Sequence, residues 1–391
     1  MRYRAGLTGL AVAAVLAPAA GAAAYAQPAS AGVHLQQEAA SYNQQVLQGD
    51  LDELVQKDGV VGAEALMVTG SGWFAAVSGV GDRETSAPMP AQGYFRMGSN
   101  TKTFVATAIL QLVGEGRMGL DDTVERWLPK LITGNDNDGS RITVRHLLQH
   151  TSGLFNYTAD KAFSAGDADQ HYQPEQLVKV ALNHKPTFQP GAPGEFEYSN
   201  TNYVLAGMII KSVTGNDWRE QVRTKIIEPL GLAHTFSPKD DPKLPAPHAK
   251  GYYRMDKGGP LVDTTEMDMS WGDAAGDLVT TSDDLIRFWQ GLLGGKLLKP
   301  EQKAEMLKTV TTKNFIPGAE YGLGIMKRPL AGGGSYWGHG GTVPGHLNDN
   351  GFSEDGKRGI VLLRSSNDPD LGDKRDERTD RLIEKALRKA R

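Results

Sequence analysis

Ser99 and Lys102 are the residues whose types and spacing most directly indicate catalytic chemistry. They form an S-x-x-K segment between an extended stretch and the apolar, helix-like residues 104–113. This position predicts Ser99 at a helix N-terminus, with Lys102 one turn later on the same face. A serine hydroxyl is a poor nucleophile at neutral pH, but an adjacent amine kept neutral by desolvation can take its proton. Backbone N–H groups at the helix start can also stabilise an oxyanion. Taken alone, the same spacing would suit a helix cap followed by an exposed lysine.

Tyr198 and Asn200 form a second candidate group, in a loop between the turn-forming residues 190–194 and a helical run. A phenol can relay a proton when cationic neighbours lower its pKa. An asparagine amide can orient a lysine or a substrate carbonyl. On its own, a tyrosine in such a loop is more often a surface packing residue.

His339, Gly340 and Gly341 form the third candidate group, which follows a strand-like pair of aromatic residues near the chain end. Glycines at this point would let an extended substrate approach and pair with the strand edge. The alternative is a glycine-rich turn with a solvated histidine. A rival segment at residues 257–259 lies in a loop and fits the role less well.

The composition excludes several classes of protein. The chain has no cysteine, so disulfides, thiolate metal sites and a cysteine nucleophile are excluded. Acidic residues number 46 against 42 basic ones, and the net charge of -4 with no basic stripe argues against a nucleic-acid partner. The histidines lack metal-ligand spacing, and residues 135–139 do not fit an EF-hand register. We therefore expect no metal and no other cofactor.

The first residues predict an export signal. Arg2 and Arg4 precede an apolar Ala/Leu/Val run that ends in a small-x-small pattern at residues 24–26. This pattern predicts a signal peptide over residues 1–26, cleaved near Ala26, and a secreted, extracellular mature protein. A retained anchor is the less favoured alternative, because the run is short for a bilayer span. We expect the mature form to have no membrane anchor and to be a monomer.

Periodicity places these candidates in an α+β fold. Helices are predicted at residues 35–57, 104–113, 147–150, 174–183, 202–214, 282–293 and 380–391. Strands are predicted at residues 62–69, 73–80, 94–97, 322–326, 335–338 and 359–363. This order indicates an antiparallel sheet built from both chain ends and flanked by the terminal helices, with a mainly helical region inserted between them. We expect an N-terminal α/β part at 27–95, a helical region at 96–315 that starts near the serine, and C-terminal strands and helix at 316–391.

Together the three groups resemble a known set of motifs. The chain is similar to the serine beta-lactamase and D-alanyl-D-alanine carboxypeptidase superfamily, in its class C-like branch, whose variants are S-x-x-K, Y-x-N and H-x-G. Further similarity lies in residues 95–98, 142–154, 270–276 and 321–324. The resemblance spans nearly the whole mature chain and is greatest to secreted D-alanyl-D-alanine carboxypeptidase/transpeptidases. It implies a beta-lactamase/transpeptidase-like fold.

The resemblance also implies a role for each candidate residue. Ser99 would be the acylated nucleophile and Lys102 its base, while Tyr198 would carry the proton to the leaving amine. Asn200 would hold the substrate amide, and His339 would occupy the position of the third-motif lysine or histidine. The remaining candidates are the backbone N–H groups of Ser99 and Thr342 as oxyanion hole, and Trp271, Phe163, Gly340 and Gly341 along the substrate cleft.

Two departures concern recognition of the substrate carboxylate. The position that aligns with the family's carboxylate-binding arginine is Met326, followed by Lys327 and Arg328, which could restore the charge by a shift in register. The hydroxyl residue of the third motif is replaced by Gly340. We therefore expect a penicillin-binding D-alanyl-D-alanine carboxypeptidase, acting on a peptide or beta-lactam. The alternatives are an esterase, a D-amino-acid peptidase or a class C-like beta-lactamase, and then a non-catalytic cell-wall or antibiotic-binding module.

Overall fold

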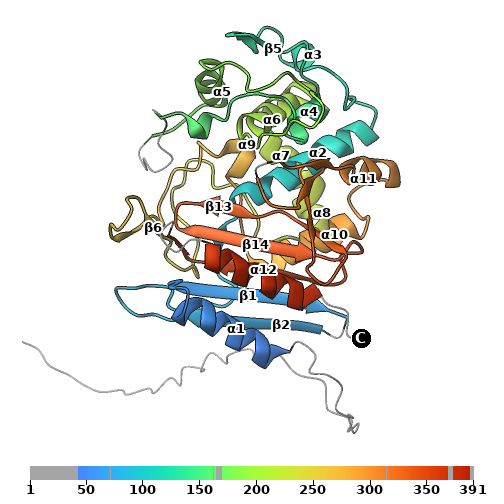
Figure 1. Cartoon of the computed structure of the whole chain (residues 1–391). Helices are drawn as coiled ribbons and strands as arrows, with labels where there is room; N and C mark the ends of the chain where they lie inside the picture. The colour runs from blue at the N-terminus through green and yellow to red at the C-terminus, as the bar shows by residue number, and fades with distance from the viewer. Residues whose placement is uncertain are drawn as a thin grey trace, which may run out of the picture. The chain divides into compact units, whose positions relative to one another are not determined.

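The computed structural model describes residues 43–70, 72–161, 163, 170–313, 315–368 and 373–387. Its largest sheet is antiparallel and joins strands from both ends of the chain, in the order β2-β1-β15-β14-β12-β11-β10-β9, with β13 paired to β14 (Figure 1). The strands are β1 (Gly62–Thr69), β2 (Gly72–Gly79), β9 (Val310–Thr311), β10 (Glu320–Tyr321), β11 (Met326–Pro329), β12 (Ser335–Gly338), β13 (Gly341–Val343), β14 (His346–Phe352) and β15 (Gly359–Arg364).

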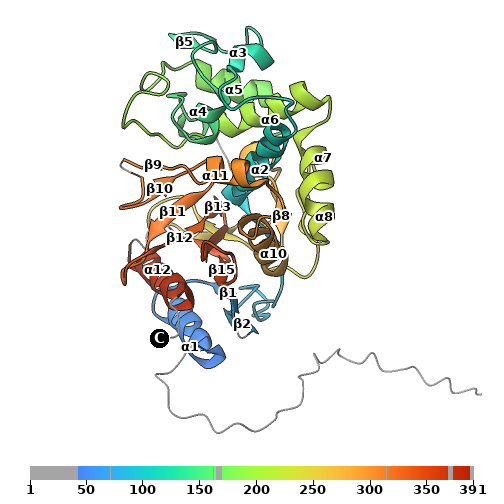
Figure 2. The ribbon, with the colours of Figure 1, turned by 90° about the vertical axis from the view of Figure 1, so that its right-hand side faces the viewer.

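Two terminal helices, α1 (Gln44–Gln56) and α12 (Asp373–Leu387), cover one face of this sheet (Figures 1 and 2). The side chain of Asn43 caps α1 by accepting hydrogen bonds from two backbone N–H groups of the first turn. Apolar residues at helical spacing bury the sheet-facing sides, namely Leu47, Leu51 and Leu54 on α1 and Leu382, Ile383 and Ala386 on α12. The predicted fold, with a sheet from both chain ends flanked by the terminal helices and an inserted helical region, is confirmed.

The inserted region lies on the other face of the sheet and carries most of the helices. They are η1 (Gly98–Asn100), α2 (Thr101–Gly114), α3 (Val124–Trp127), α4 (Val144–Leu148), η2 (Tyr157–Ala159), α5 (Pro174–Leu182), α6 (Thr201–Thr214), α7 (Trp218–Val222), η3 (Arg223–Ile227), α8 (Glu228–Leu230), α9 (Asp273–Gly276), α10 (Ser282–Leu293) and α11 (Pro300–Met306). Short strands pair between them: β3 (Phe95–Arg96) with β8 (Val279–Thr280), β4 (Thr133–Gly134) with β5 (Asn137–Asp138), and β6 (Tyr252–Arg254) with β7 (Leu261–Asp263) and β16 (Ser366–Asn367).

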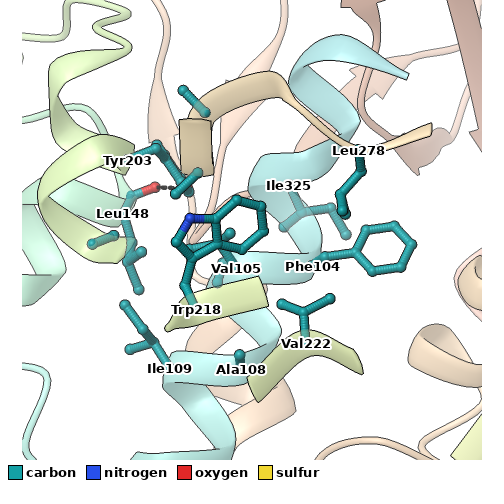
Figure 3. Packing of buried hydrophobic residues seen from close by; sticks show 14 of the residues in the cluster. Phe104, Val105, Ala108, Ile109, Leu148, Tyr203, Trp218, Val222, Leu278 and Ile325 are labelled. Atoms are coloured by element: carbon teal, nitrogen blue, oxygen red, sulfur yellow. Dashed lines mark hydrogen bonds between the residues drawn. The ribbon is translucent and has the colours of Figure 1, made fainter. Parts of the chain in front are cut away.

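Helix α2 is the centre of the larger hydrophobic core. It is buried almost all round, as a helix surrounded by other elements must be. Figure 3 shows Phe104 and Val105 of α2 facing Trp218 and Val222 of α7. The helix that begins at the S-x-x-K segment is therefore held rigidly from several sides.

Of the segment predicted as a strand at 322–326, residues 322–325 instead form a turn between β10 and β11, and only Met326 belongs to a strand. The backbone N–H of Gly322 donates to the carbonyl of Ile325 at 2.8 Å. Gly324 has φ +74°, and a Cβ there would lie 2.5 Å from that of Ala106. The prediction is wrong because the chain must reverse here, close against α2.

The polar stretch that begins at His346, where no strand is predicted from the sequence, is the seven-residue strand β14. It pairs with β15 along its whole length, from Leu347 opposite Arg364 to Phe352 opposite Gly359. Most of its side chains are buried although many are polar. A strand of this composition can be buried because Asn348, Asp349 and Asn350 have hydrogen-bond partners inside the protein.

The predicted signal peptide, residues 1–26, lies outside the described residues. Within the described ranges, no helix has both the length and the apolar character that crossing a bilayer requires.

Candidate active site

Ser99 lies in η1, which leads directly into α2 and faces strand β13. Gly98 has φ +52°, and a Cβ at this position would lie 2.9 Å from the backbone nitrogen of Thr342. This close approach requires glycine and holds the serine turn against β13. Ser99 is partly exposed, whereas Lys102 is fully buried one turn later. Lys102 Nζ lies 3.0 Å from Ser99 Oγ, as the predicted spacing requires.

The Lys102 amine has two further partners, both of which can only accept hydrogen bonds. Nζ lies 2.7 Å from Asn200 Oδ1 and 2.8 Å from the backbone carbonyl of Ala275. Burial lowers the pKa of Lys102 well below its ordinary value. A neutral amine has two N–H groups and one lone pair, and the two acceptors occupy both N–H groups. The lone pair is therefore left to face the hydroxyl of Ser99, which is the geometry of a general base.

Tyr198 lies beside this pair as a neutral phenol. Lys102 Nζ lies 4.9 Å from the centre of its ring. Burial raises the pKa of Tyr198 above its ordinary value, and a hydrogen bond with Ser99 only partly opposes the shift. Lys102, the neighbouring amine, does not offset this shift, because its own pKa is lowered by burial. A neutral phenol at this position is suited to pass a proton on rather than to act as the base.

His339 follows β12 and is also held neutral. Its Nδ1 donates to the carbonyl of Gly340 at 2.7 Å, so Nε2 accepts a hydrogen bond from the Tyr321 hydroxyl at 2.9 Å. Burial and the nearby Lys102 lower the pKa of His339 to about 3. In place of the third-motif lysine, this position therefore carries an uncharged ring whose two nitrogens are both engaged.

Strand β13 brings the glycines of the third motif against the residues before Ser99. A Cβ on Gly341 would overlap the carbonyl oxygen of Met97, so only glycine fits there. Thr342 follows, next to Gly98. The predicted oxyanion hole, formed by the N–H groups of Ser99 and Thr342, has its two residues on adjacent segments and stays a prediction.

Three buried asparagines connect the serine turn to β14. Asn100, inside the S-x-x-K segment, donates to Asn348 and accepts from Asn350 Nδ2 at 2.8 Å. Asn348 Nδ2 also donates to the carbonyl of Met97 at 3.1 Å. Asn350 exchanges two hydrogen bonds with the backbone of His339, at 2.6 and 3.1 Å. We call Asn100, Asn348 and Asn350 the asparagine bridge. It ties the first motif to the third.

The two predicted aromatic cleft residues lie together. Trp271 packs with Met267, Met269 and Val343, and Val343 directly follows Thr342 in β13. The ring of Phe163 meets that of Trp271 edge-on at 6.3 Å. Both rings therefore belong to one aromatic cluster that borders the strand of the third motif.

Lys327 and Arg328 do not join the catalytic group. Lys327 Nζ lies 3.5 Å from Glu320, while Arg328 donates to Asp380 of α12 at 2.8 Å. Met326, at the position of the family's arginine, packs with Phe196 and Tyr321, close to Tyr198.

Sequence reasoning missed several contributors. The carbonyl of Ala275 is a backbone group that no side-chain motif reveals. His150 accepts hydrogen bonds from the Ser199 N–H at 3.2 Å and the Asn202 amide at 3.1 Å, and its ring centre lies 4.3 Å from that of Tyr198. The asparagines of β14 could have been found from their alternation along the strand, because period two places them on one face.

Among the residues that the structure describes, no three or more histidine, aspartate or glutamate side chains form a group that could hold a metal ion.

The chain matches a known protein family and is similar to a named relative. The family model described as "Beta-lactamase" matches residues 47–386. A Bacillus subtilis protein named "Putative penicillin-binding protein PbpX" is 31% identical over 281 residues, which are 71% of this chain and 64% of that protein. The chain thus spans less than two thirds of the length of this relative.

Solved structures add a second kind of similarity. A D-stereospecific amidohydrolase from a Streptomyces species is 37% identical, with a TM-score of 0.81 over 88% of this chain and 99% of its own. A D-amino acid amidase from Ochrobactrum anthropi SV3, complexed with D-phenylalanine, is 30% identical, with a TM-score of 0.76 over 87% of this chain and 97% of its own.

Proposed function

Because the chain belongs to the beta-lactamase family and is a serine hydrolase, we propose that it hydrolyses amides of D-amino acids through an acyl-enzyme on Ser99. The neutral amine of Lys102 supports this role for Ser99, since its lone pair faces the hydroxyl at 3.0 Å. The proposal has two parts, the catalytic steps and the choice of substrate.

In the first step Ser99 Oγ attacks the amide carbonyl and its proton passes to Lys102 Nζ. The carbonyl oxygen gains the negative charge, which the backbone N–H groups of Ser99 and Thr342 would stabilise. The C–N bond then breaks. The leaving amine takes the proton back from Lys102 through the phenol of Tyr198, which can donate one proton while it accepts another.

In the second step a water molecule attacks the acyl-enzyme. Lys102 takes one proton from the water and returns it to Ser99 Oγ as the ester bond breaks. One amide and one water molecule thus give one carboxylic acid and one amine. Both steps use the same base, which explains why its two N–H groups need fixed acceptors on Asn200 and Ala275.

The choice of substrate class rests on one observation: the surface where the family's arginine would lie is apolar. Met326 packs there with Phe196 and Tyr321. The exposed ring of Phe315 stacks on Tyr198, with ring centres 5.0 Å apart and planes 9° from parallel. A free carboxylate on the substrate would therefore find no positively charged group among these side chains. This supports a substrate whose leaving group is uncharged, such as an amide.

The D configuration is supported by the two structural neighbours, which are named as a D-stereospecific amidohydrolase and a D-amino acid amidase. A second candidate is the D-alanyl-D-alanine carboxypeptidase expected from the sequence. Similarity to the Bacillus protein favours it, and the missing carboxylate partner disfavours it.

Initial rates on matched substrates test the proposal. We expect D-phenylalaninamide to be hydrolysed much faster than L-phenylalaninamide, and an amidated D-Ala-D-Ala peptide faster than its free acid. Ser99→Ala should abolish both activities. A preference for the free acid would overturn the amidase proposal in favour of the carboxypeptidase, and activity retained in Ser99→Ala would overturn the assignment of the nucleophile.

Intact mass after incubation with benzylpenicillin separates the remaining alternatives. A lasting adduct on the wild type alone would indicate a penicillin-sensitive enzyme, and rapid drug hydrolysis without an adduct a beta-lactamase. Secretion through a signal peptide over residues 1–26 is also part of the proposal. N-terminal sequencing of exported protein should begin close to residue 27.

A further inference from the structure

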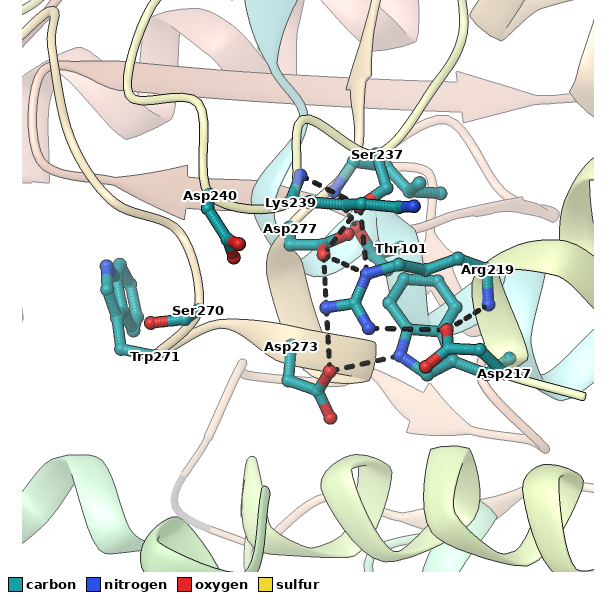
Figure 4. Close-up of polar contacts among 12 residues, drawn as sticks. Thr101, Asp217, Arg219, Ser237, Lys239, Asp240, Ser270, Trp271, Asp273 and Asp277 are labelled. Carbon is teal, nitrogen blue, oxygen red and sulfur yellow. Dashed lines mark hydrogen bonds and ion pairs between the residues drawn. The ribbon is translucent and has the colours of Figure 1, made fainter. Parts of the chain in front are cut away.

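Behind Lys102 lies a short helix, α9, whose two ends are held by one arginine. Arg219 of α7 reaches Asp273, the first residue of α9, and Asp277, the residue that follows it (Figure 4). The middle of α9 contributes the Ala275 carbonyl that accepts a hydrogen bond from Lys102. The same short helix segment thus contacts both the arginine and the catalytic amine.

The contacts of Arg219 are short and largely buried. Its guanidinium lies 2.9 Å from Asp273 Oδ1 and 2.7 Å from Asp277 Oδ2, and the Ser237 hydroxyl donates to the same Asp277 oxygen at 2.9 Å. The Asp273 and Asp277 side chains are 4% and 1% exposed, against 19% for Arg219. Charged hydrogen bonds in such surroundings are strong and directional. They fix both ends of α9.

The backbone of α9 needs this support. Asp273 has φ +37°, which a residue other than glycine adopts only under strain. The indole N–H of Trp218 donates to the same Asp273 oxygen that binds Arg219, at 3.0 Å. Adjacent residues of α7, Trp218 and Arg219, therefore both hold Asp273 in its strained conformation.

The residue that follows Asp277 contacts the turn that contains Ser99. The N–H of Leu278, next to Asp277, donates to Thr101 Oγ1 at 3.2 Å, and its carbonyl accepts from the Met97 N–H at 2.9 Å. A shift of α9 would move both the Ala275 carbonyl and the support of the S-x-x-K turn.

We propose that Arg219 is a positioning residue that, through Asp273 and Asp277, aims the Ala275 carbonyl at Lys102 and so keeps the lone pair of its amine directed at Ser99. This inference rests on the proposed role of Lys102 as base. Without Arg219, α9 relaxes, Lys102 loses one fixed acceptor, and water reaches the amine. The pKa of Lys102 then rises towards its ordinary value, so a larger fraction is protonated at neutral pH.

No charged side chain among the described titratable neighbours of Lys102 complicates the interpretation of its pKa. The titratable groups that face it are Tyr198, Tyr203, His150 and His339. Burial raises the pKa of both tyrosines and lowers that of both histidines, so all four are uncharged at neutral pH. A change in the Lys102 pKa therefore reports its hydration and hydrogen bonds rather than a neighbour's charge.

The test compares Arg219→Gln and Arg219→Lys with Arg145→Gln as matched control. Arg145 also binds two carboxylates, Asp121 at 3.0 Å and Glu305 at 2.7 Å, but these contacts lie outside the catalytic group. Arg219 and Asp273 line a cavity of about 1040 Å³, so water can replace the guanidinium in Arg219→Gln. Arg219→Lys keeps the charge but loses the fork that reaches both aspartates.

Two measurements are made on each folded variant. The first is kcat/KM for p-nitrophenyl acetate against pH, a substrate that requires neither D configuration nor an amide. The second is the pKa of Lys102, from the pH dependence of its acetylation rate followed by peptide mass spectrometry. Arg219→Gln should lower kcat/KM at neutral pH by about 10- to 100-fold, move the acid limb of the profile to higher pH, and raise the Lys102 pKa. Arg219→Lys should show the same changes at smaller size, and Arg145→Gln neither.

An unchanged Lys102 pKa in the folded Arg219 variants would overturn the inference. Esterase activity that survives in Ser99→Ala would instead overturn the proposed function, while the labelling measurement would still report on the effect of Arg219. The two failures are therefore distinguishable.

Discussion

The two sides of the catalytic serine are built in different ways. On the helical side, Asn200 and the Ala275 carbonyl hold a single atom, Lys102 Nζ, at 2.7 and 2.8 Å. On the sheet side, the asparagine bridge holds backbone, because Asn348 and Asn350 bind the carbonyls of Met97 and His339. The helical side fixes the direction of a proton transfer, whereas the sheet side fixes where the chain segments meet.

This difference predicts different responses to mutation. Loss of a partner on the helical side should reduce the rate of the chemical step and leave the fold intact. Loss of a partner on the sheet side leaves buried polar groups unsatisfied, so stability should fall together with activity. Three experiments sharpen or break this comparison.

The largest effect is expected from Lys102→Met, which keeps an apolar chain of similar length but removes the base. We expect kcat to fall by about 10³- to 10⁴-fold, since general base catalysis is lost. Tyr198→Phe, which removes only the relay, should cost about 10²-fold. Single-turnover rates on D-phenylalaninamide, whose leaving amine must take up a proton, measure both variants. An equal loss in the two would contradict the assignment of Lys102 alone as base.

A smaller loss of activity is expected from Asn350→Ala on the sheet side. It removes the donor to Asn100 Oδ1 and to the His339 carbonyl, and unsatisfied buried groups cost about 1–3 kcal/mol each. Urea denaturation should show a loss of this size, with kcat lowered by about 10-fold because the serine turn is less well held. Asn216→Ala, at an exposed position after α6, is the control. Unchanged stability with a large loss of kcat would contradict the contrast between the two sides.

The smallest effect is the dependence of stability on pH that Lys102 introduces. Its folded pKa lies well below that of an unfolded lysine, so at pH values between the folded and the unfolded pKa the unfolded state binds one more proton. Stability contributed by this group therefore rises with pH, by about 1.4 kcal/mol per pH unit. The free energy of unfolding of wild type minus Lys102→Met should show this slope. Lys179→Met, at an exposed position on α5, should not alter it.

The sequence predicted the two sides of the serine unequally. The S-x-x-K spacing and the apolar run after it follow local helix rules, so α2 and the Ser99 to Lys102 contact could be predicted. The fold class followed from the order of helices and strands. Strand β14 was not predicted because its sequence is polar rather than apolar, and only tertiary contacts with Asn100 and His339 explain the burial of its asparagines. The charge state of Tyr198 also depends on burial, which local sequence does not report.

Two residues of the helical region show a further limit of prediction from sequence. Ala275 acts through its backbone carbonyl, and Arg219 of α7 acts through a different helix, α9. Neither role has a characteristic residue type at a characteristic spacing. The predicted roles of Lys327 and Arg328 depended on an alignment register, and the actual register of β11 places Arg328 against α12.

The pairing of β1 with β15 sets a condition on when the serine turn can be held from both sides as the chain folds. The N–H of Ser365 donates to the carbonyl of Gly62 at 2.9 Å, across almost the whole chain. A nascent chain carries Ser99 and Lys102 long before it carries β14 and β15, whose residues hold the serine turn from the sheet side. Contacts so distant in sequence also form slowly. The serine turn is therefore held from both sides only after segments about 300 residues apart in the sequence have come together.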